Sequence, residues 1–320
     1  MVEDTQASSK RTFLVTGGMG CLGAWTLYHL HQRGEQAVSF DLSDNRYRLS
    51  LLLPEAEQDS INFVQGDLTD TAQVRELVED HGITHIVHLA ALQVPFCRDN
   101  PPLGAHVNVT GTINVFEAAR QVGIKHLSYA SSIAVYGPAS DYPQRLIPHD
   151  AARLPRTFYG VYKVANEDSA AVYWRDHGIS STALRPYTVY GVGRDQGITS
   201  EPTKALAAVS RGESYHINFG GTMQFHWASD VAQQFITAAL QPSGDALAFN
   251  LGSAPVSVEA FIEAVKMLRP NAELTCSEQI LPFPEGFEAD ALHAHANEVF
   301  ETPLVEGIGA TLEHFERLAN

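Results

Sequence analysis

Cysteine is scarce in this chain, in which three residues (Cys21, Cys97 and Cys276) stand far apart among 320 positions. Such a set contains neither a disulfide framework nor the paired spacing of a zinc site. Basic residues are also few, because 21 lysines and arginines stand against 37 acidic residues and leave a formal net charge of −16. Nucleic acids and anionic membrane surfaces require basic patches, so both are disfavoured as partners.

Long apolar runs are absent as well. No stretch approaches the ~20 residues that a helix needs to cross a bilayer. The segment from Met1 to Lys10 is polar and lacks the apolar core of a signal peptide. With 44% hydrophobic and 18% charged residues, the composition is that of a globular protein and excludes extended disorder. We therefore expect a cytoplasmic protein of one or two domains with a large buried core.

Glycine, in contrast, is concentrated at one place. In Thr12-Phe-Leu-Val-Thr-Gly-Gly-Met-Gly-Cys-Leu-Gly23, a short apolar run leads into four glycines within seven positions. Each glycine lowers helix stability, so this number is expected only where a ligand must approach the backbone closely. The free N–H groups and partial positive charge of a helix N-terminus suit a pyrophosphate. The segment therefore predicts a strand, a phosphate-binding turn and a helix that begins near Gly20.

The residues that follow favour a dinucleotide. The next apolar run, Ala37 to Asp41, predicts a second strand that ends in an acid. Asp41 lies 21 residues after Gly20, close to the offset of ~20 expected for the carboxylate that binds the ribose of adenosine. A carboxylate there would repel a 2′-phosphate, which favours NAD over NADP, although Arg46 lies nearby. The alternative is a tight strand-to-helix turn in an unrelated α/β protein.

Strands and helices alternate along the first 190 residues. Further strands are predicted at 61–65, 84–91, 126–130 and 182–185, and helices at 70–81, 102–122 and 158–177. A loop with a short helical piece is expected over 42–60, and a loop over 141–156. This alternation predicts an α/β fold with a doubly wound parallel sheet, the Rossmann fold. Its ligand crevice should lie at the carboxyl ends of the strands.

Beyond Gly191 the pattern changes to loops and separate helices. The helices are predicted near 202–211, 229–240, 258–268 and 311–319. We expect residues 1–190 to form the NAD-binding domain with the catalytic residues. Residues 191–320 should form a smaller substrate-capping region, with a strand near 247–250 that rejoins the main sheet.

Two short patterns near the predicted crevice could carry catalysis. Tyr159 and Lys163 are four residues apart on one helical face, where an ammonium beside a phenol would lower the pKa of the tyrosine. Such a tyrosine can take a proton from a substrate hydroxyl. Tyr162 has Asn166 at the matching offset and is the weaker candidate. Ser132 follows the fifth strand, where a hydroxyl can orient the substrate oxygen, although serines at strand ends are often turn formers.

These patterns belong to a longer series in chain order. It comprises Thr16-Gly17-Gly-Met-Gly20-Cys-Leu-Gly23, Asp41, Gly66-Asp67-Leu68, His88-Leu-Ala-Ala91, Asn108-Val-Thr-Gly-Thr112, Ser131-Ser132-Ile-Ala-Val-Tyr136-Gly137, Tyr159-x-x-x-Lys163, Arg185-Pro-Tyr-Thr-Val-Tyr-Gly191, Ser229-Asp230-Val-Ala232 and Asn250-Leu-Gly252. The series resembles the extended short-chain dehydrogenases/reductases, in their NAD-dependent epimerase/dehydratase group. The resemblance covers nearly the whole chain.

The resemblance implies roles for individual residues. Tyr159 would be the catalytic base, Lys163 would lower its pKa and hold the nicotinamide ribose, and Ser132 would be the catalytic hydroxyl. The implied NAD-binding residues are Gly17, Gly20, Cys21, Leu22, Gly23, Asp41, Asp67, Leu68, Leu89, Ala90, Ala91, Asn108, Tyr159, Lys163, Pro186 and Tyr187. The two long helices at 102–122 and 158–177 would pair with their copies in a homodimer.

Departures from the family pattern narrow the expected substrate. Ile133 and Ala134 stand where dehydratases of the group carry an Asp-Glu pair, so water elimination is disfavoured. The segment 221–228 lacks the arginine with which nucleotide-sugar epimerases grip the diphosphate. A free sugar, sugar acid or related polyol is therefore expected as substrate. The candidate substrate-binding residues are Gln93, Ser131, Ser132, Thr188, Thr199 and Ser200.

Three functions remain open from the sequence. The first is an NAD-dependent dehydrogenase or epimerase that acts on a secondary alcohol of such a substrate. The second is a nucleotide-sugar 4-epimerase of the UDP-hexose type, and the third is a non-catalytic NAD-sensing protein. No metal is expected, because His85 and His88 bracket a buried strand and His293 and His295 lack a ligand pattern.

Overall fold

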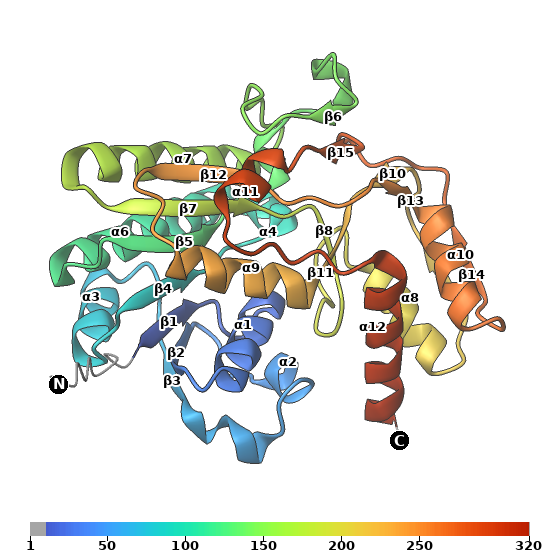
Figure 1. Cartoon of the computed structure of the whole chain (residues 1–320), viewed down its shortest axis with the longest axis horizontal. Coiled ribbons are helices and arrows are strands. Elements are labelled where there is room, and N and C mark those ends of the chain that lie inside the picture. The colour runs from blue at the N-terminus through green and yellow to red at the C-terminus, as the bar shows by residue number, and fades with distance from the viewer. Residues whose placement is uncertain (1–10, 320) are drawn as a thin grey trace, which may run out of the picture.

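Seven parallel strands form the centre of the molecule (Figure 1). The computed structural model describes residues 11–319, so the polar segment from Met1 to Lys10 lies outside the described residues. The strands are β1 (Thr12–Thr16), β2 (Gln36–Asp41), β3 (Ile61–Gln65), β4 (His85–His88), β5 (His126–Ala130), β7 (Ser180–Arg185) and β12 (Ala246–Asn250). Their order in the sheet is β12-β7-β5-β4-β1-β2-β3. The strands β1 to β3 are added in one direction across the sheet, and those from β4 on are added in the other, so the strand order reverses between β1 and β4. Open α/β sheets bind ligands at such a point.

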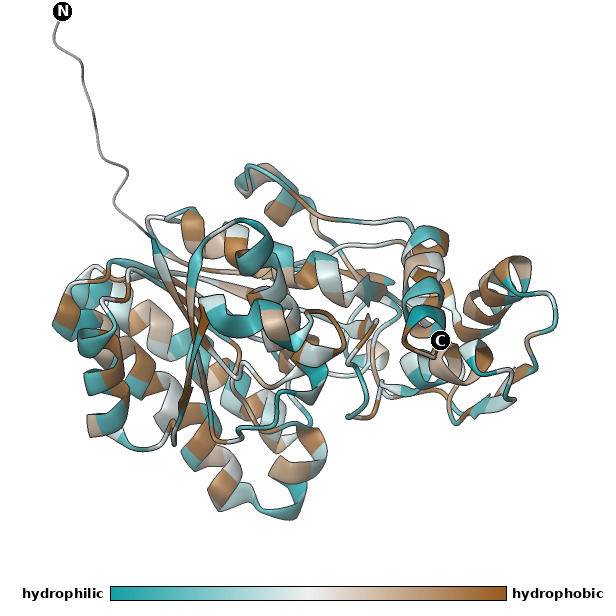
Figure 2. Cartoon of the chain, turned by 90° about the horizontal axis from the view of Figure 1, so that it is seen from below, coloured by the Kyte–Doolittle hydropathy of each residue, from teal (hydrophilic) through white to brown (hydrophobic). Residues whose placement is uncertain are grey.

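Helices cover both faces of this sheet. One face carries α1 (Cys21–Gln32) and α9 (Ala228–Leu240), and the other carries α3 (Thr71–Asp80), α6 (Gly111–Val122) and α7 (Phe158–His177). Because strand side chains alternate, Phe13 and Val15 of β1 pack beneath α1 and α9, whereas Leu14 packs toward α3 and α6. Figure 2 shows hydrophobic and hydrophilic residues alternating along the covering helices, as expected for helices with one buried face.

Residues beyond the sheet form a second core at one end of the molecule. This part contains α8 (Glu201–Ser210), α10 (Val258–Leu268) and α12 (Leu304–Ala319), whereas α11 (Asp290–His295) packs against β12 of the main sheet. The short strands outside the main sheet are β6 (Leu146–Ile147), β8 (Thr188–Tyr190), β9 (Tyr215–Ile217), β10 (Thr222–Met223), β11 (Phe225–Trp227), β13 (Val256–Ser257), β14 (Leu274–Cys276) and β15 (Gly286–Phe287). Of these, β6 belongs to the loop before α7. Tyr190, Leu206, Phe261 and Ile308 pack together in this core. In Figure 1 it lies to the right of the sheet.

Helix ends follow the capping residues of the sequence. The Asp70 side chain caps α3 by accepting hydrogen bonds from the backbone N–H groups of Ala72 and Gln73. Thr157 caps α7 in the same way, with its hydroxyl oxygen 3.0 Å from the Gly160 nitrogen. Gly178 ends α7 in the left-handed conformation that favours glycine. These local signals explain why the predicted range 158–177 agrees with α7.

Other predictions agree only in part. The helix expected over 102–122 has these bounds within one residue, but it consists of α5 (Pro101–Ala105), a π-helical turn at His106–Thr110 and α6. It is preceded by α4 (Val94–Asp99), which was not predicted. The short helical piece expected within 42–60 is confirmed as α2 (Tyr47–Ser50). The strand expected at 84–91 ends at His88, because the following residues leave the sheet and line the cleft. Helix α12 begins at Leu304 rather than at 311.

Strand β12 pairs in parallel with β7, so the sheet includes a strand from the C-terminal part of the chain. The division into residues 1–190 and 191–320 stays a prediction. Among residues 11–319, no helix has both the length and the apolar character of a membrane span.

Candidate functional site

A cleft of about 760 Å³ lies at the carboxyl ends of the strands. Loops that follow β1 to β5, one face of α7 and the segment 193–199 line it. The predicted site residues that line this cleft are Gly17, Gly20, Cys21, Leu22, Gly23, Asp41, Asp67, Leu68, Leu89, Ala90, Ala91, Gln93, Ser131, Ser132, Tyr159, Lys163, Pro186, Tyr187 and Thr199. Strand ends thus bring together residues that are far apart in the sequence.

The glycine loop leaves no room for side chains. Gly17 has a φ of +72°, and a Cβ atom added there would lie 2.8 Å from the backbone nitrogen of Ala90. A Cβ atom on Gly23 would collide with the carbonyl oxygen of Gly17. Helix α1 begins after Gly20 with no side-chain cap, so its first N–H groups stay available at the cleft. This cradle fits the pyrophosphate of a dinucleotide.

Asp41 is fixed at the end of β2. Its carboxylate accepts hydrogen bonds from the backbone N–H groups of Met19 and Ser43, each 3.0 Å away. The carboxylate therefore lies beside the glycine loop, where it fits the ribose hydroxyls of an adenosine. Arg46 stacks its guanidinium on the Phe63 ring at 3.6 Å and does not line the cleft. This arrangement fits NAD, because Arg46, the nearby cation that could bind the 2′-phosphate of NADP, packs on Phe63 instead.

Tyr159 and Lys163 face the cleft from the first turns of α7. The Lys163 ammonium lies 5.5 Å from the centre of the Tyr159 ring and donates a hydrogen bond to the Ala130 carbonyl oxygen at 2.6 Å. The Ser132 hydroxyl oxygen accepts the N–H of Ala134 at 3.1 Å. A phenol, an amine and a hydroxyl therefore gather at the end of β5.

The pKa of Tyr159 differs from the expectation. Burial raises the pKa of this phenol to about 12, while a hydrogen bond with Ser132 and the positive charge of Arg194 act in the opposite direction. Lys163 is not among the groups that lower this pKa, contrary to the expectation, and desolvation is the largest effect. Burial also lowers the pKa of Lys163 to about 8.

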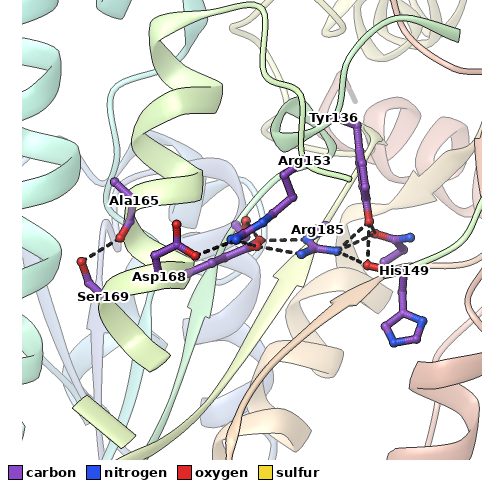
Figure 3. Close-up of polar contacts among 10 residues, drawn as sticks. Tyr136, His149, Arg153, Ala165, Asp168, Ser169 and Arg185 are labelled. Carbon is purple, nitrogen blue, oxygen red and sulfur yellow. Dashed lines mark hydrogen bonds and ion pairs between the residues drawn. The ribbon is translucent and has the colours of Figure 1, made fainter. Parts of the chain in front are cut away.

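Ser131 borders the cleft, but its hydroxyl proton has a partner. The hydroxyl donates to the Glu167 carboxylate at 2.5 Å. Arg185 binds the same carboxylate through two hydrogen bonds of 2.8 and 2.7 Å. On its other side, Arg185 donates hydrogen bonds from Nη1 to the Tyr136 hydroxyl and to the His149 carbonyl oxygen (Figure 3). The buried pair thus links β7, α7 and the loop before α7.

Three predicted site residues do not reach the cleft. Asn108 is buried, and its side chain binds the backbone of Leu92. Thr188 is fully buried and donates to the sulfur of Met223, and Ser200 is fully buried at the start of α8. Nothing in this arrangement supports contact of these three side chains with a ligand.

Two arginines in the cleft were not predicted. Arg48 forms an ion pair with Asp195 at 2.7 Å and donates to the carbonyl oxygen of Met19 at 2.9 Å. Arg194 lies on the same side of the cleft. Arg48 lies in the four-residue helix α2 and Arg194 in a loop, and neither segment is long enough to carry a periodic pattern. The only available sequence signal was the charged pair Arg194-Asp195 within a glycine-rich segment that follows a strand.

The residues set aside from catalysis have structural partners. The Tyr162 hydroxyl donates to the carbonyl oxygen of Pro101. His88 lies between the hydroxyls of Thr16 and Thr112 at 2.7 and 3.0 Å. Among residues 11–319, no three histidine, cysteine or acidic side chains gather closely enough to hold a metal ion.

Comparisons with known proteins identify one family. The family model described as the NAD dependent epimerase/dehydratase family matches residues 13–252. The chain is 28% identical to UDP-glucuronate 4-epimerase 4 of Arabidopsis thaliana over 315 residues, which cover 91% of this chain and 70% of that protein.

Solved structures share the fold. MoeE5, in complex with UDP-glucose and NAD, is 26% identical with a TM-score of 0.80, covering 97% of this chain and all of that one. An L-threonine dehydrogenase of Clostridium difficile is 20% identical with a TM-score of 0.85, covering 97% of this chain and 98% of that one. At this identity the second likeness concerns the fold alone.

Proposed function

The chain belongs to the NAD-dependent epimerase/dehydratase family, and from that premise we propose that it oxidises or epimerises a secondary alcohol of a sugar, sugar acid or related polyol. The observation that carries the proposal is the placement of Ser132, Tyr159 and Lys163 in one cleft with the glycine loop. The partner is a small molecule held on the open side of that cleft.

In this proposal each catalytic residue has a separate role. Tyr159 takes the proton of the substrate hydroxyl, which Ser132 holds in place. When bound, NAD supplies the acceptor for the hydride that leaves the same carbon. Burial raises the pKa of Tyr159 to about 12, and the Ser132 hydroxyl and the Arg194 guanidinium, which both favour the phenolate, oppose that effect. Lys163, anchored on the Ala130 carbonyl, would hold the nicotinamide ribose.

Two outcomes share these steps. An epimerase rotates the keto form of the substrate and returns the hydride to its other face, whereas a dehydrogenase releases the oxidised product. Tightly held NAD in the purified protein would favour the epimerase. Free NADH that accumulates with substrate would favour the dehydrogenase.

The segment 221–228 supports a substrate without a nucleotide. It contains no arginine or lysine, and Met223 and Phe225 point into the C-terminal core. The cations that line the cleft among residues 11–319 are Arg48, Lys163 and Arg194, which lie near the glycine loop and the catalytic helix. A diphosphate would therefore lack the usual partner from this segment.

A UDP-hexose-type 4-epimerase is the second candidate. Its support is the similarity to UDP-glucuronate 4-epimerase 4, which extends over 91% of this chain. A panel of free sugars, sugar acids, polyols and UDP-sugars decides between the two. Each compound is incubated with the NAD-loaded protein and followed by NADH absorbance and by NMR of the product. Conversion of UDP-sugars alone would overturn the assignment to non-nucleotide substrates.

The Tyr159→Phe variant tests the catalytic assignment. We expect it to lose at least ~10²–10³-fold in turnover, because a general base of this kind contributes about that much. NADH affinity, measured by fluorescence titration, should change little, since the ring remains. A non-catalytic NAD sensor would show no substrate turnover in the wild-type protein.

Tyr162→Phe is the matched control. Its hydroxyl binds the Pro101 carbonyl on the other side of α7, away from the cleft. This variant should keep turnover within about a factor of three, since a single neutral hydrogen bond contributes modestly. Normal turnover in Tyr159→Phe would refute the assignment.

A homodimer through α6 and α7 and a cytoplasmic location remain part of the proposal. The support for the first is an exposed apolar face on α7, which includes Phe158, Val161 and Val172.

A further inference from the structure

Residues 193–199 form a strap along one wall of the cleft, between two buried ends. Val192, just before the strap, is buried, and its carbonyl oxygen accepts the indole N–H of Trp25 at 2.9 Å. Ser200, just after the strap, is fully buried at the start of α8. Residues 194–199, in contrast, are exposed or partly exposed. The strap is therefore fixed at its ends and open to solvent along most of its length.

Two glycines allow the strap to change its backbone conformation. Gly193 has a φ of +81° and Gly197 has a φ of +99°, in a region that glycine adopts without steric cost. A few residues of this kind are enough to absorb the dihedral changes of a moving segment. The centre of the strap can therefore move while Val192 and Ser200 stay in place.

One ion pair connects the strap to the other side of the cleft. Arg48 of α2 donates from Nε and Nη2 to Oδ1 of Asp195, at 3.0 and 2.7 Å. Its Nη1 atom donates to the carbonyl oxygen of Met19 in the glycine loop at 2.9 Å. A Cβ atom added to Gly193 would lie 3.6, 3.8 and 3.9 Å from the Cβ, Cγ and Cδ atoms of Arg48, so the strap also packs on the arginine stem. A single side chain thus joins the strap to the glycine loop.

This connection lies along the expected path of the dinucleotide. In the proposed site, Asp41 holds the adenosine end and Lys163 the nicotinamide end, both in the same cleft. The glycine loop adjoins Asp41, whose carboxylate accepts the N–H of Met19 at 3.0 Å. Met19, Arg48 and Asp195 all line this cleft. The ion pair therefore crosses the cleft beside the expected position of the pyrophosphate.

Every hydrogen bond of this connection joins two atoms of the chain, so it does not require the dinucleotide as a partner. The Arg48 and Asp195 side chains are 20% and 44% exposed, and ion pairs of this exposure are weak enough to open often. We propose that the Arg48–Asp195 pair is a gate that controls how fast NAD enters and leaves the cleft. Because the pair has to open for passage in either direction, it slows entry and exit alike and leaves the equilibrium affinity nearly unchanged. This role concerns cofactor exchange and goes beyond the proposed reaction.

Asp195→Asn tests the gate, because it removes the acid and keeps the size of the side chain. NADH association and dissociation are followed by stopped-flow fluorescence on the full chain, with excess NAD as the displacing ligand. Both rate constants should rise about three- to fivefold, the contribution of a partly exposed ion pair, while Kd changes by less than about twofold. Electrostatics alone predicts the opposite sign for dissociation, since removal of an acid near the pyrophosphate would slow it.

Arg48→Met provides the second arm of the test. In this background Asp195→Asn should produce no further acceleration, because the partner of the acid is already lost. The control is Glu213→Gln, which breaks the exposed ion pair with Arg211 outside the cleft and removes the same charge. It should leave both rate constants unchanged. Thermal unfolding verifies that each variant is folded.

Salt gives an independent readout. Raising NaCl from about 0.05 M to about 0.5 M screens the exposed pair, so the dissociation rate of the wild-type protein should approach that of Asp195→Asn. The proposal is overturned by unchanged or slower dissociation from Asp195→Asn, by equal acceleration in the Arg48→Met background or in Glu213→Gln, or by absence of NADH binding. Failure of the proposed reaction would appear separately, as turnover retained by Tyr159→Phe.

Discussion

Gly17 and Gly34 both have a left-handed backbone, with φ of +72° and +68°. A side chain on Gly34 would meet nothing within 4 Å, whereas one on Gly17 would meet the Ala90 backbone. Gly34→Ala should therefore cost only the strain of an alanine in the left-handed conformation, about 1–2 kcal/mol. Gly17→Ala should lose more stability and weaken NADH binding at least ~10-fold, since the loop must move away from the pyrophosphate.

Urea unfolding and NADH fluorescence titration measure the two effects on each variant. If Gly17→Ala binds NADH as well as Gly34→Ala does, the glycine loop is not the pyrophosphate cradle.

Buried histidines set the response to acid. Burial lowers the pKa of His88 to about 3 and that of His226 to about 4. Both are therefore neutral in the folded protein at pH values where unfolded histidine, with its pKa of about 6.5, binds a proton. Stability should fall as the pH drops from 6.5 toward 4. At pH 5.5 each group should contribute a loss of ~1.4 kcal/mol.

Urea unfolding at pH 7.5 and pH 5.5 checks this expectation. His226→Asn should reduce the difference in the free energy of unfolding between pH 7.5 and pH 5.5. His216→Asn, at an exposed position, should leave that difference unchanged. An equal pH dependence in all three proteins would contradict the role of burial.

At the scale of elements, the Glu167–Arg185 pair joins α7 to β7. Both side chains are 5% exposed. Arg185→Met would leave the buried Glu167 carboxylate with Arg153, at 3.3 Å, as its charged partner, so the change should destabilise the fold by about 3–5 kcal/mol. The double variant with Glu167→Gln should recover part of that loss, because no unpaired charge remains.

The matched control is Arg145→Met, which breaks the exposed ion pair with Glu285. That change should alter the free energy of unfolding by less than about 1 kcal/mol, as surface pairs do. Equal losses for Arg185→Met and Arg145→Met would show that the buried pair does not hold these elements together.

At the scale of the whole molecule, the exposed apolar residues of α7 predict self-association. Val161 is 48% exposed and Phe158 is 52% exposed, on the side of α7 that faces away from the sheet. Val161→Asp should shift the protein from dimer to monomer in sedimentation equilibrium, because a charge would be buried between the two copies.

Met267→Asp is the control, because Met267 is 76% exposed on α10 in the C-terminal part. This variant should have the same molecular mass as the wild-type protein in sedimentation equilibrium. A monomeric wild-type protein would end the proposal of a dimer through these helices.

Much of the fold was predictable because its signals are local. Gly178 ends α7 within its own sequence and Thr157 caps its start, and short strand-like segments before turns or serines marked β3 and β5. The glycine loop, Asp41 and the Tyr159–Lys163 pair were also identified from spacing alone. A parallel sheet then requires these strand ends to meet at one edge, so their gathering in a cleft followed from topology.

Other features depend on contacts between distant segments. Arg48 and Asp195 are 147 positions apart, and no sequence pattern links them. Thr188 and Ser200 occupy plausible positions in the sequence, yet neighbouring strands and helices bury them away from the cleft. The pKa of Tyr159 also depends on distant residues, because desolvation comes from everything packed around the ring. The amino-acid sequence by itself determined the sheet, the glycine loop and the catalytic helix, since each is specified by neighbours along the chain. Only the tertiary structure decided which charges face the cleft, because burial and ion pairing are set by residues far away in the sequence.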